Sequence, residues 1–323
     1  MKRHAFRAGD WVIVRSPSEI LSSLDTDGTL NGLPFMPEMA DWCGKRFRVE
    51  RRAEKTCVDV APPLFPNRRF GGNHVVFMEG PRCDGRSHDG CKRGCKIFWN
   101  EAWLRPARSG ERATATSSSG RGALISRLRT KSDEKHYFCQ STELHRATRP
   151  FPGNRKLWRL RVAFREIRNR DRSALELLRL FALWCWLRLS KRMRGSLSGP
   201  HQRAPSASFE LKPGDRVNVK SRVALLATLD HRGTNRGLKI CPEMLRYCGA
   251  QAEVDTLVDR IIDERTGEIR QLASTVTLRN VRNNRIFNSS GFECLCGGET
   301  GDCPRGERMY WREIWLERVN SEI

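Results

Sequence analysis

The stretch Gly9-Asp-Trp-Val-Ile-Val14 occurs a second time as Gly214-Asp-Arg-Val-Asn-Val219, 205 residues further along the chain. The same spacing, without a gap, relates Pro37-Glu-Met39 to Pro242-Glu-Met244. Single residues between these stretches also match at that spacing. Chance does not produce so many matches in one register. The sequence is therefore an internal duplication.

A second shared stretch ends each copy. Phe98-Trp-Asn-Glu-Ala-Trp-Leu104 corresponds to Tyr310-Trp-Arg-Glu-Ile-Trp-Leu316, now at a spacing of 212 residues. What two copies share is as often a requirement of the fold as of the function. The matches place the copies at residues 5–106 and 209–319. The chain then divides into module 1–106, a connecting segment 107–208 and module 209–323.

Each copy shows the pattern of short β-strands. Val12 and Val14, like Val217 and Val219, alternate with other residues at the period of a strand. The Gly-Asp pair in front of these valines is typical of a turn. Pro37 suits the first position of a helical turn. The modules are therefore expected to be small and rich in β-structure.

The opening Gly-Asp-x-Val-x-Val, the long loop after it and the compact later strands resemble SH3-like barrels, including the KOW and nitrile-hydratase-β-like kinds. The resemblance covers the first half of each module and implies a fold but no activity. The longer repeated phrases also resemble those of a bacterial protein family, and this adds no function. We therefore expect a mainly β chain, with two duplicated SH3-like small barrels, cysteine-rich metal loops and a basic, partly helical linker.

The formal charge of +22 is concentrated in the middle of the chain. Residues 106–208 contain 23 Lys and Arg against 7 Asp and Glu, whereas residues 1–105 and 209–323 have net charges of only +5 and +1. Basic surfaces attract polyanions. If a nucleic acid binds this protein, we expect it to bind through residues 155–194.

The connecting segment is predicted to be disordered over residues 107–125, which are rich in Ser, Thr, Gly and Arg. A helix is predicted over about 171–194. Its uninterrupted apolar run covers residues 180–187 and is shorter than the about 20 residues of a bilayer span, so no transmembrane span is expected. The helix could dock on the barrels and bury Phe181 and Trp184, which we favour. Peripheral membrane contact or a macromolecular partner are the alternatives.

The cysteines of copy one lie in Cys83-Asp-Gly-Arg-Ser-His88-Asp-Gly-Cys91-Lys-Arg-Gly-Cys95. Zinc prefers four thiolate or imidazole donors in a tetrahedron, and short spacings allow one loop to surround the ion. We predict a structural zinc site formed by Cys83, His88, Cys91 and Cys95. Metal-free buried thiols, or a reactive cysteine with His88 as its base, are the alternatives.

Copy two has no histidine in the corresponding loop, and Glu307 stands where copy one has Cys95. Its metal site is therefore less well defined. The candidate zinc ligands are Cys294, Cys296, Cys303 and Cys248, with Cys241 as an alternative to the last.

An alternation of tryptophan and glutamate is also repeated. Side chains two residues apart in a strand share one face, which would place a carboxylate between two indoles. Such a pocket could bind a cation or a sugar-like ligand. The simpler interpretation, which we favour, is that the indoles close each barrel and the glutamate pairs with an arginine. The residues are Trp99, Glu101, Trp103, Trp311, Glu313 and Trp315.

The sequence predicts a zinc-stabilised tandem binding or scaffold protein, an accessory to a larger assembly or biosynthetic pathway, with a protein partner. No apolar stretch follows the basic N-terminal residues, so we expect no Sec-type signal peptide and a cytoplasmic location. There the 12 cysteines would favour metal ligation or burial over disulfides. The alternatives are a metal- or thiol-dependent enzyme or enzyme subunit, and a nucleic-acid-binding protein that uses the basic segment.

Overall fold

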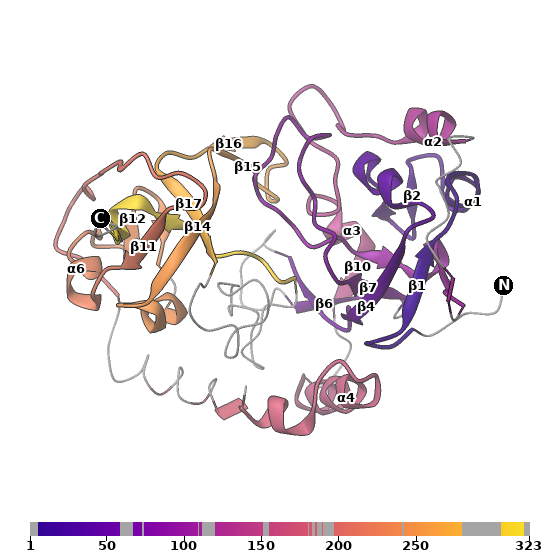
Figure 1. Cartoon of the computed structure of the whole chain (residues 1–323), viewed down its shortest axis with the longest axis horizontal. Helices are drawn as coiled ribbons and strands as arrows, with labels where there is room; N and C mark the ends of the chain where they lie inside the picture. Colours follow the sequence, from indigo (N-terminus) through magenta and orange to yellow (C-terminus); the bar gives the residue numbers. More distant parts are fainter. Residues whose placement is uncertain are drawn as a thin grey trace. The chain divides into compact units, whose positions relative to one another are not determined.

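The computed structural model divides the chain into two compact units (Figure 1). The first unit contains residues 1–178 and 262–270, and the second contains residues 179–261 and 271–323. Within the described part of the chain, no helix is both long and apolar enough to cross a membrane. The described residues are 6–58, 67–72, 74–108, 110–111, 120–150, 155–179, 181, 182, 185, 189, 197–240, 242–279 and 305–319.

A five-stranded antiparallel sheet in the order β8-β7-β4-β1-β9 forms the frame of the first unit. The opening strand pairs on both sides, with Val12 opposite Phe47 and Val14 opposite Leu104. Val12 and Val14 are fully buried, as expected for a central strand that faces the core. The strands are β1 (Trp11–Val14), β4 (Arg46–Arg52), β7 (Val75–Met78), β8 (Trp99–Asn100) and β9 (Leu104–Pro106).

The second unit contains a sheet with the same order, β18-β17-β14-β11-β19. The turn after the first helix is also the same in both copies, because Thr29 and Thr234 each donate to an aspartate four residues earlier, Asp25 and Asp230. These matches support the duplication predicted from the sequence. The strands are β11 (Arg216–Val219), β14 (Gln251–Leu257), β17 (Thr275–Arg279), β18 (Trp311–Arg312) and β19 (Leu316–Arg318).

Short elements fill the loop between the first two strands of each sheet. In copy one, Ser16 caps the first helix, and Ser16 and Glu19 form a capping box. The helical turn predicted to begin at Pro37 is present, as a 3-10 turn. These elements are α1 (Pro17–Ser23), β2 (Thr29–Leu30), β3 (Leu33–Pro34) and η1 (Pro37–Trp42), with α6 (Arg222–Leu226), β12 (Thr234–Asn235), β13 (Leu238–Lys239) and η3 (Pro242–Tyr247) in copy two.

The fold class is mixed, with more strand than helix, so the prediction of a mainly β chain was only partly correct. Two sheets of similar topology are present, but within the described residues no strand pairing joins the edge strands of either sheet into a closed barrel. Helices account for the rest of the difference, because the connecting segment contains more of them than the sequence pattern indicated.

The repeated tryptophans form the centre of each core. Trp99, Trp103, Trp311 and Trp315 are fully buried. They do not lie in one strand as predicted, because each strand ends after its first tryptophan and a 3-10 turn follows. In copy one, Asn100 accepts a hydrogen bond from Ala102 and so begins this turn. The turns are η2 (Glu101–Trp103) and η4 (Glu313–Trp315).

Part of the connecting segment belongs to the first unit. A helix begins at Arg121, inside the stretch predicted to be disordered, and its Leu124 is fully buried in the core of copy one. Further along, β10 pairs with β6, so this segment also extends a small sheet in the order β10-β6-β5. The elements are β5 (Thr56–Cys57), β6 (Asn67–Phe70), α2 (Arg121–Arg127), α3 (Leu144–Ala147) and β10 (Thr148–Pro150).

Residues 262–270 of the second sequence copy, which form most of a hairpin, also belong to the first unit. The hairpin is formed by β15 (Arg260–Ile262) and β16 (Ile269–Gln271). The amide of Tyr137 donates to the carbonyl of Gly267 over 2.8 Å. The Arg93 guanidinium lies 3.2 Å from the carboxylate of Glu264. The first unit is therefore larger than the predicted module 1–106.

Helix α4 (Arg155–Arg168) is attached to the first unit through buried charges. Arg165 lies 3.0 Å from the Glu54 carboxylate, and Glu166 lies 3.4 Å from the Lys55 ammonium group. Just beyond the helix, the Asn169 side chain donates to Glu54 over 3.0 Å. Buried ion pairs need such mutual partners to offset desolvation. The polar face of this helix therefore faces the protein.

Helical residues follow Ser173, in the region where a helix was predicted. Docking on the barrels, which we favoured, would bury Phe181, and Phe181 is 55% exposed within its own unit. Leu175 and Leu178 are exposed as well. Trp184 lies outside the described residues. Docking of this helix on the barrels stays a prediction.

Replacing Leu124 tests whether residues 121–127 belong to the folded unit. Leu124→Ala should lower the free energy of unfolding by about 2–5 kcal/mol, because it leaves a cavity in the core. The exposed neighbour provides a matched control, since Ile125→Ala should change stability by less than about 0.5 kcal/mol. Chemical unfolding followed by tryptophan fluorescence measures both. If the two variants are equally stable, residues 121–127 are part of the linker and not of the folded unit.

Asp171 should make the stability depend on pH. Burial raises the pKa of its carboxyl to about 7, although the amide of Arg52 donates to it and lowers the pKa. A carboxyl with a raised pKa holds its proton more tightly in the folded state. Its contribution to stability is therefore full below about pH 4 and is lost as the pH rises to about 7.

Asp171→Asn should remove this dependence, which amounts to at most about 1.4 kcal/mol per pH unit. Urea unfolding at several pH values between 4 and 7 measures the slope. Asp133→Asn is the control, because the amides of Lys135 and His136 and the His136 side chain lower the pKa of Asp133 to about 2, so it titrates below this range. A slope that is unchanged by Asp171→Asn would contradict the assignment.

Candidate metal centre

The loop from Cys83 to Cys95 is closed at its base. An isolated bridge pairs Arg82 with Lys96, and the amide of Cys83 donates to the carbonyl of Cys95 over 2.9 Å. Inside the loop, the carbonyl of Gly85 accepts from the amides of His88 and Gly90. These backbone bonds bring thiols that are distant in sequence to the same end of the first unit.

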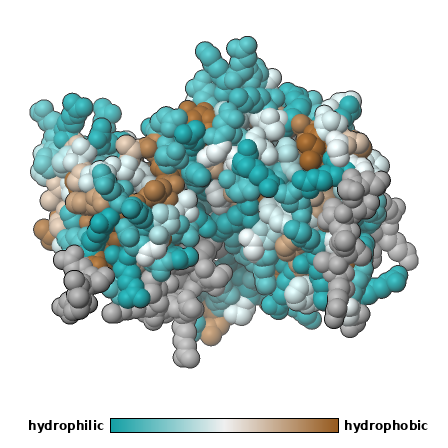
Figure 2. Space-filling view, turned by 45° about the horizontal axis from the view of Figure 1, so that its top comes forward, coloured by the Kyte–Doolittle hydropathy of each residue, from teal (hydrophilic) through white to brown (hydrophobic). Residues whose placement is uncertain are grey.

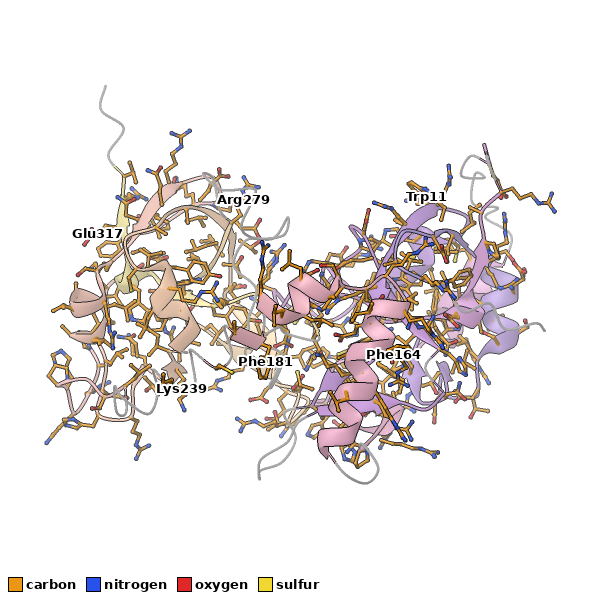
Figure 3. All side chains as sticks on the ribbon, turned by 90° about the horizontal axis from the view of Figure 1, so that it is seen from below. Trp11, Phe164, Phe181, Lys239, Arg279 and Glu317 are labelled. Carbon is orange, nitrogen blue, oxygen red and sulfur yellow. The ribbon has the colours of Figure 1, made fainter. Side chains whose placement is uncertain are left out.

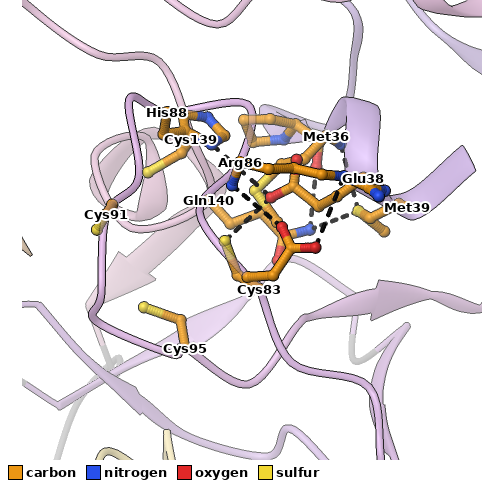
Figure 4. Close-up of polar contacts among 12 residues, drawn as sticks. Met36, Glu38, Met39, Cys83, Arg86, His88, Cys91, Cys95, Cys139 and Gln140 are labelled. Atoms are coloured by element: carbon orange, nitrogen blue, oxygen red, sulfur yellow. Dashed lines mark hydrogen bonds and ion pairs between the residues drawn. The ribbon is translucent and has the colours of Figure 1, made fainter. Parts of the chain in front are cut away.

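Three potential ligands lie close together at this loop. Glu38 of η1, Cys83 and His88 each offer one ligand atom, and these atoms lie within 4.8 Å of one another (Figure 4). The Cys83 thiol donates to Glu38 Oε1 over 3.0 Å, and His88 Nδ1 lies 3.7 Å from the same oxygen. A carboxylate, a thiolate and an imidazole are all zinc ligands. This group could hold a metal ion.

The orientation of His88 suits a ligand. Its Nε2–H donates to the carbonyl of Phe138 over 3.2 Å. Nδ1 is then left with its lone pair, and it makes no hydrogen bond within the described residues. Metal-bound histidines commonly donate their second N–H to a backbone carbonyl in this way. Glu38 and His88 are each 1% exposed, so both donors are removed from water.

The predicted set of Cys83, His88, Cys91 and Cys95 is only partly gathered into this group. Cys83 and His88 belong to it, whereas Cys91 and Cys95 lie beyond its ligand atoms. Burial raises the pKa of the Cys91 thiol. Burial and the Glu38 carboxylate raise the pKa of Cys83 strongly. Without a metal these two thiols are therefore protonated, which argues against the alternative of a reactive cysteine.

Glu38 was not among the ligands predicted from the sequence. Its side chain points into the protein, toward Cys83 and His88. The available signal was its repetition, although copy two retains the glutamate without the histidine. A further buried thiol at the same end of the unit, Cys139 of the connecting segment, was also missed.

Most of the site predicted for copy two lies outside the described residues, including Cys294, Cys296 and Cys303. Cys248 is described, and burial raises the pKa of its thiol. Neither finding tests a second zinc site.

The Trp–Glu–Trp candidates are placed in the cores. Glu101 lies 2.5 Å from the Arg52 guanidinium and accepts the amide of Phe6 over 2.9 Å. In copy two, Glu313 accepts the amide of Phe209 in the same way, over 2.5 Å. Each glutamate therefore holds the chain where it enters the module. With fully buried indoles, this arrangement favours the packing interpretation over a ligand pocket.

The chain matches no protein-family model, no curated protein and no solved structure. The function must therefore be argued from the geometry of the chain itself.

Gly85 provides a test of the loop. A Cβ atom at this position would lie 2.0 Å from the carbonyl oxygen of Cys91, and the backbone has a φ of +71°. Backbone strain alone costs about 1–3 kcal/mol. Gly85→Ala should lower the free energy of unfolding by more than this, because the new Cβ atom also clashes with the Cys91 carbonyl oxygen. Gly80→Ala is the matched control, because Gly80 also has a positive φ but open space around its Cβ position. If thermal unfolding shows equal losses for the two variants, the close approach of the loop is not confirmed.

Proposed function

We propose that this protein is a zinc-stabilised tandem SH3-like binding or scaffold protein that acts as an accessory to a larger protein assembly. The observation that carries the proposal is the exposed apolar stripe of α4. Leu160, Phe164 and Ile167 lie three or four residues apart, on one face of the helix, and Phe164 is 64% exposed (Figure 3).

The opposite face of α4 explains why this stripe stays exposed. Val162, Glu166 and Asn169 are buried, and the ion pairs of Glu166 and Arg165 fix the helix on the first unit. An amphipathic helix normally buries its apolar face. Here the polar face is buried and the apolar face is presented outward. Exposed apolar patches with a polar rim are typical of protein interaction sites.

The chemistry around the stripe indicates the partner. Arg161, Arg168 and Arg170 are exposed beside it, so a protein with an apolar groove and an acidic rim would complement it. On the face drawn in Figure 2, by comparison, apolar residues form small separate areas in a mainly hydrophilic surface.

The strand order supports the SH3-like part of the proposal. In both copies the first strand lies between the second and the last, and a 3-10 turn precedes the last strand. This order and this turn are those of SH3-like barrels. The zinc part rests on the Glu38, Cys83 and His88 group, whose burial is typical of a structural rather than a catalytic metal site.

The nucleic-acid alternative has weaker support. Arg165 and Arg172 of the basic segment are paired with Glu54 and Glu166 inside the first unit, so they are not available to phosphates. The enzyme alternative requires an open coordination position, and two of the three donors are almost completely buried.

The metal can be tested on the purified full-length chain. Elemental analysis should find stoichiometric zinc. Removal by a chelator should lower the melting temperature by about 8–16 °C, from a linkage contribution of about 4 kcal/mol. Metal-free protein with an unchanged melting temperature would contradict the zinc part of the proposal.

The binding surface can be tested with a photo-crosslinking amino acid at position 164 in the full chain, in the cells that produce it. We expect one discrete protein adduct, which Leu160→Ser should abolish with less than about 0.5 kcal/mol change in stability. Position 223 is the control, because Val223 is also apolar and exposed but lies on α6. Identical adducts at both positions, or flotation with anionic liposomes in place of an adduct, would contradict a protein partner.

A further inference from the structure

Cys139 is held firmly at the end of the first unit that carries the metal group. The next residue, Gln140, is buried and accepts the amide of Phe98 over 2.8 Å. It also donates to the carbonyls of Phe98 and Pro34 over 2.9 and 3.0 Å. These bonds fix Cys139 against copy one, although it belongs to the connecting segment in sequence.

Four cysteines of the loop and the connecting segment lie around one region of the first unit (Figure 4). They are Cys83, Cys91, Cys95 and Cys139. All four are free thiols, Cys91 and Cys139 are buried, and Cys83 and Cys95 are partly buried.

Contacts of two of the sulfurs bring neighbouring segments to the same point. The amide of Ile262 donates to the sulfur of Cys91 over 3.4 Å. The sulfur of Cys95 lies 3.5 Å from the hydroxyl oxygen of Ser141, two residues after Cys139. The loop of copy one, the hairpin and the connecting segment therefore meet at these thiols.

We propose that Cys83, Cys91, Cys95 and Cys139 together bind one zinc ion as a four-thiolate site. Zinc accepts four thiolates in a closed tetrahedral site without open positions. Cys139 then supplies the fourth ligand that the spacing within the loop assigns to His88. The ion ties the connecting segment and the loop of copy one together, and through the amide of Ile262 it also holds the hairpin of residues 262–270.

Glu38 and His88 take positioning roles in this arrangement. Glu38 contacts the sulfur of Cys83. His88 donates to the carbonyl of Phe138, the residue before Cys139, and so orients the segment that carries the fourth ligand. The four sulfur atoms lie further apart than the ligand atoms of Glu38, Cys83 and His88. Binding must therefore draw the thiols inward by side-chain rotation.

This inference rests on the metal part of the proposed function, and the test separates the two. Zinc content is measured for the full-length wild type and for Cys139→Ser, His88→Ala and Cys43→Ala. Cys43 is a buried thiol of the same core that lies outside the four. We expect at least a tenfold loss of zinc affinity for Cys139→Ser, a smaller loss for His88→Ala because His88 only orients the segment that carries Cys139, and unchanged affinity for Cys43→Ala.

Cobalt(II) substitution and thiol alkylation add readouts that need no variant. The cobalt protein should show the intense thiolate charge-transfer band of a four-sulfur site. Alkylation should spare these four cysteines together until a chelator is added, whereas the exposed Cys185 reacts at once.

Zinc that is kept by Cys139→Ser and lost from His88→Ala, or a cobalt band of a single thiolate, would overturn this inference but leave the proposed zinc site in place. Wild-type protein without zinc or cobalt binding would overturn both. If Cys139→Ser does not fold, the cobalt band and the alkylation pattern of the wild type decide between the outcomes.

Discussion

A carboxylate and an imidazole buried beside a thiol are the constraint on which the first unit depends. Glu38 and His88 are removed from water, and burying such groups costs several kcal/mol unless a proton or a cation offsets it. The residues that surround them come from η1, from the loop of residues 83–95 and from the connecting segment. These three parts are distant in sequence, and the polar cluster is where they meet. In the four-thiolate proposal, an ion bound by Cys83 and the neighbouring thiols would hold these parts together.

Comparison of the two copies distinguishes residues that the fold requires from residues that only copy one has. Both copies keep the buried tryptophans, the aspartate that caps its turn and the glutamate that holds the entering chain. These roles in packing, in capping the turn and in holding the entering chain explain why both copies keep these residues. The histidine at position 88 has no counterpart in copy two. A buried histidine in this loop is therefore a feature of copy one alone, and the shared residues are explained by packing.

Local and repeated features could be predicted from the sequence. The duplication, the strands after the Gly-Asp turns and the helical turn at Pro37 depend on neighbouring residues. The contacts of Glu38 and Cys139 could not be predicted, because both are made across long stretches of chain. The tryptophan alternation suited a strand, but hydrogen bonding by Asn100 favours a 3-10 turn. On α4, paired charges on the inner face reverse the usual rule that the apolar face is buried.

The central claim is that thiolates of the first copy and of the connecting segment bind one ion. X-ray absorption at the zinc edge of the purified full-length chain tests it most directly, because sulfur and nitrogen or oxygen ligands differ in bond length. The account predicts a first shell of four sulfur atoms at about 2.3 Å. A first shell made mainly of nitrogen and oxygen at about 2.0–2.1 Å with a single sulfur, as Glu38, Cys83 and His88 would give, would contradict it.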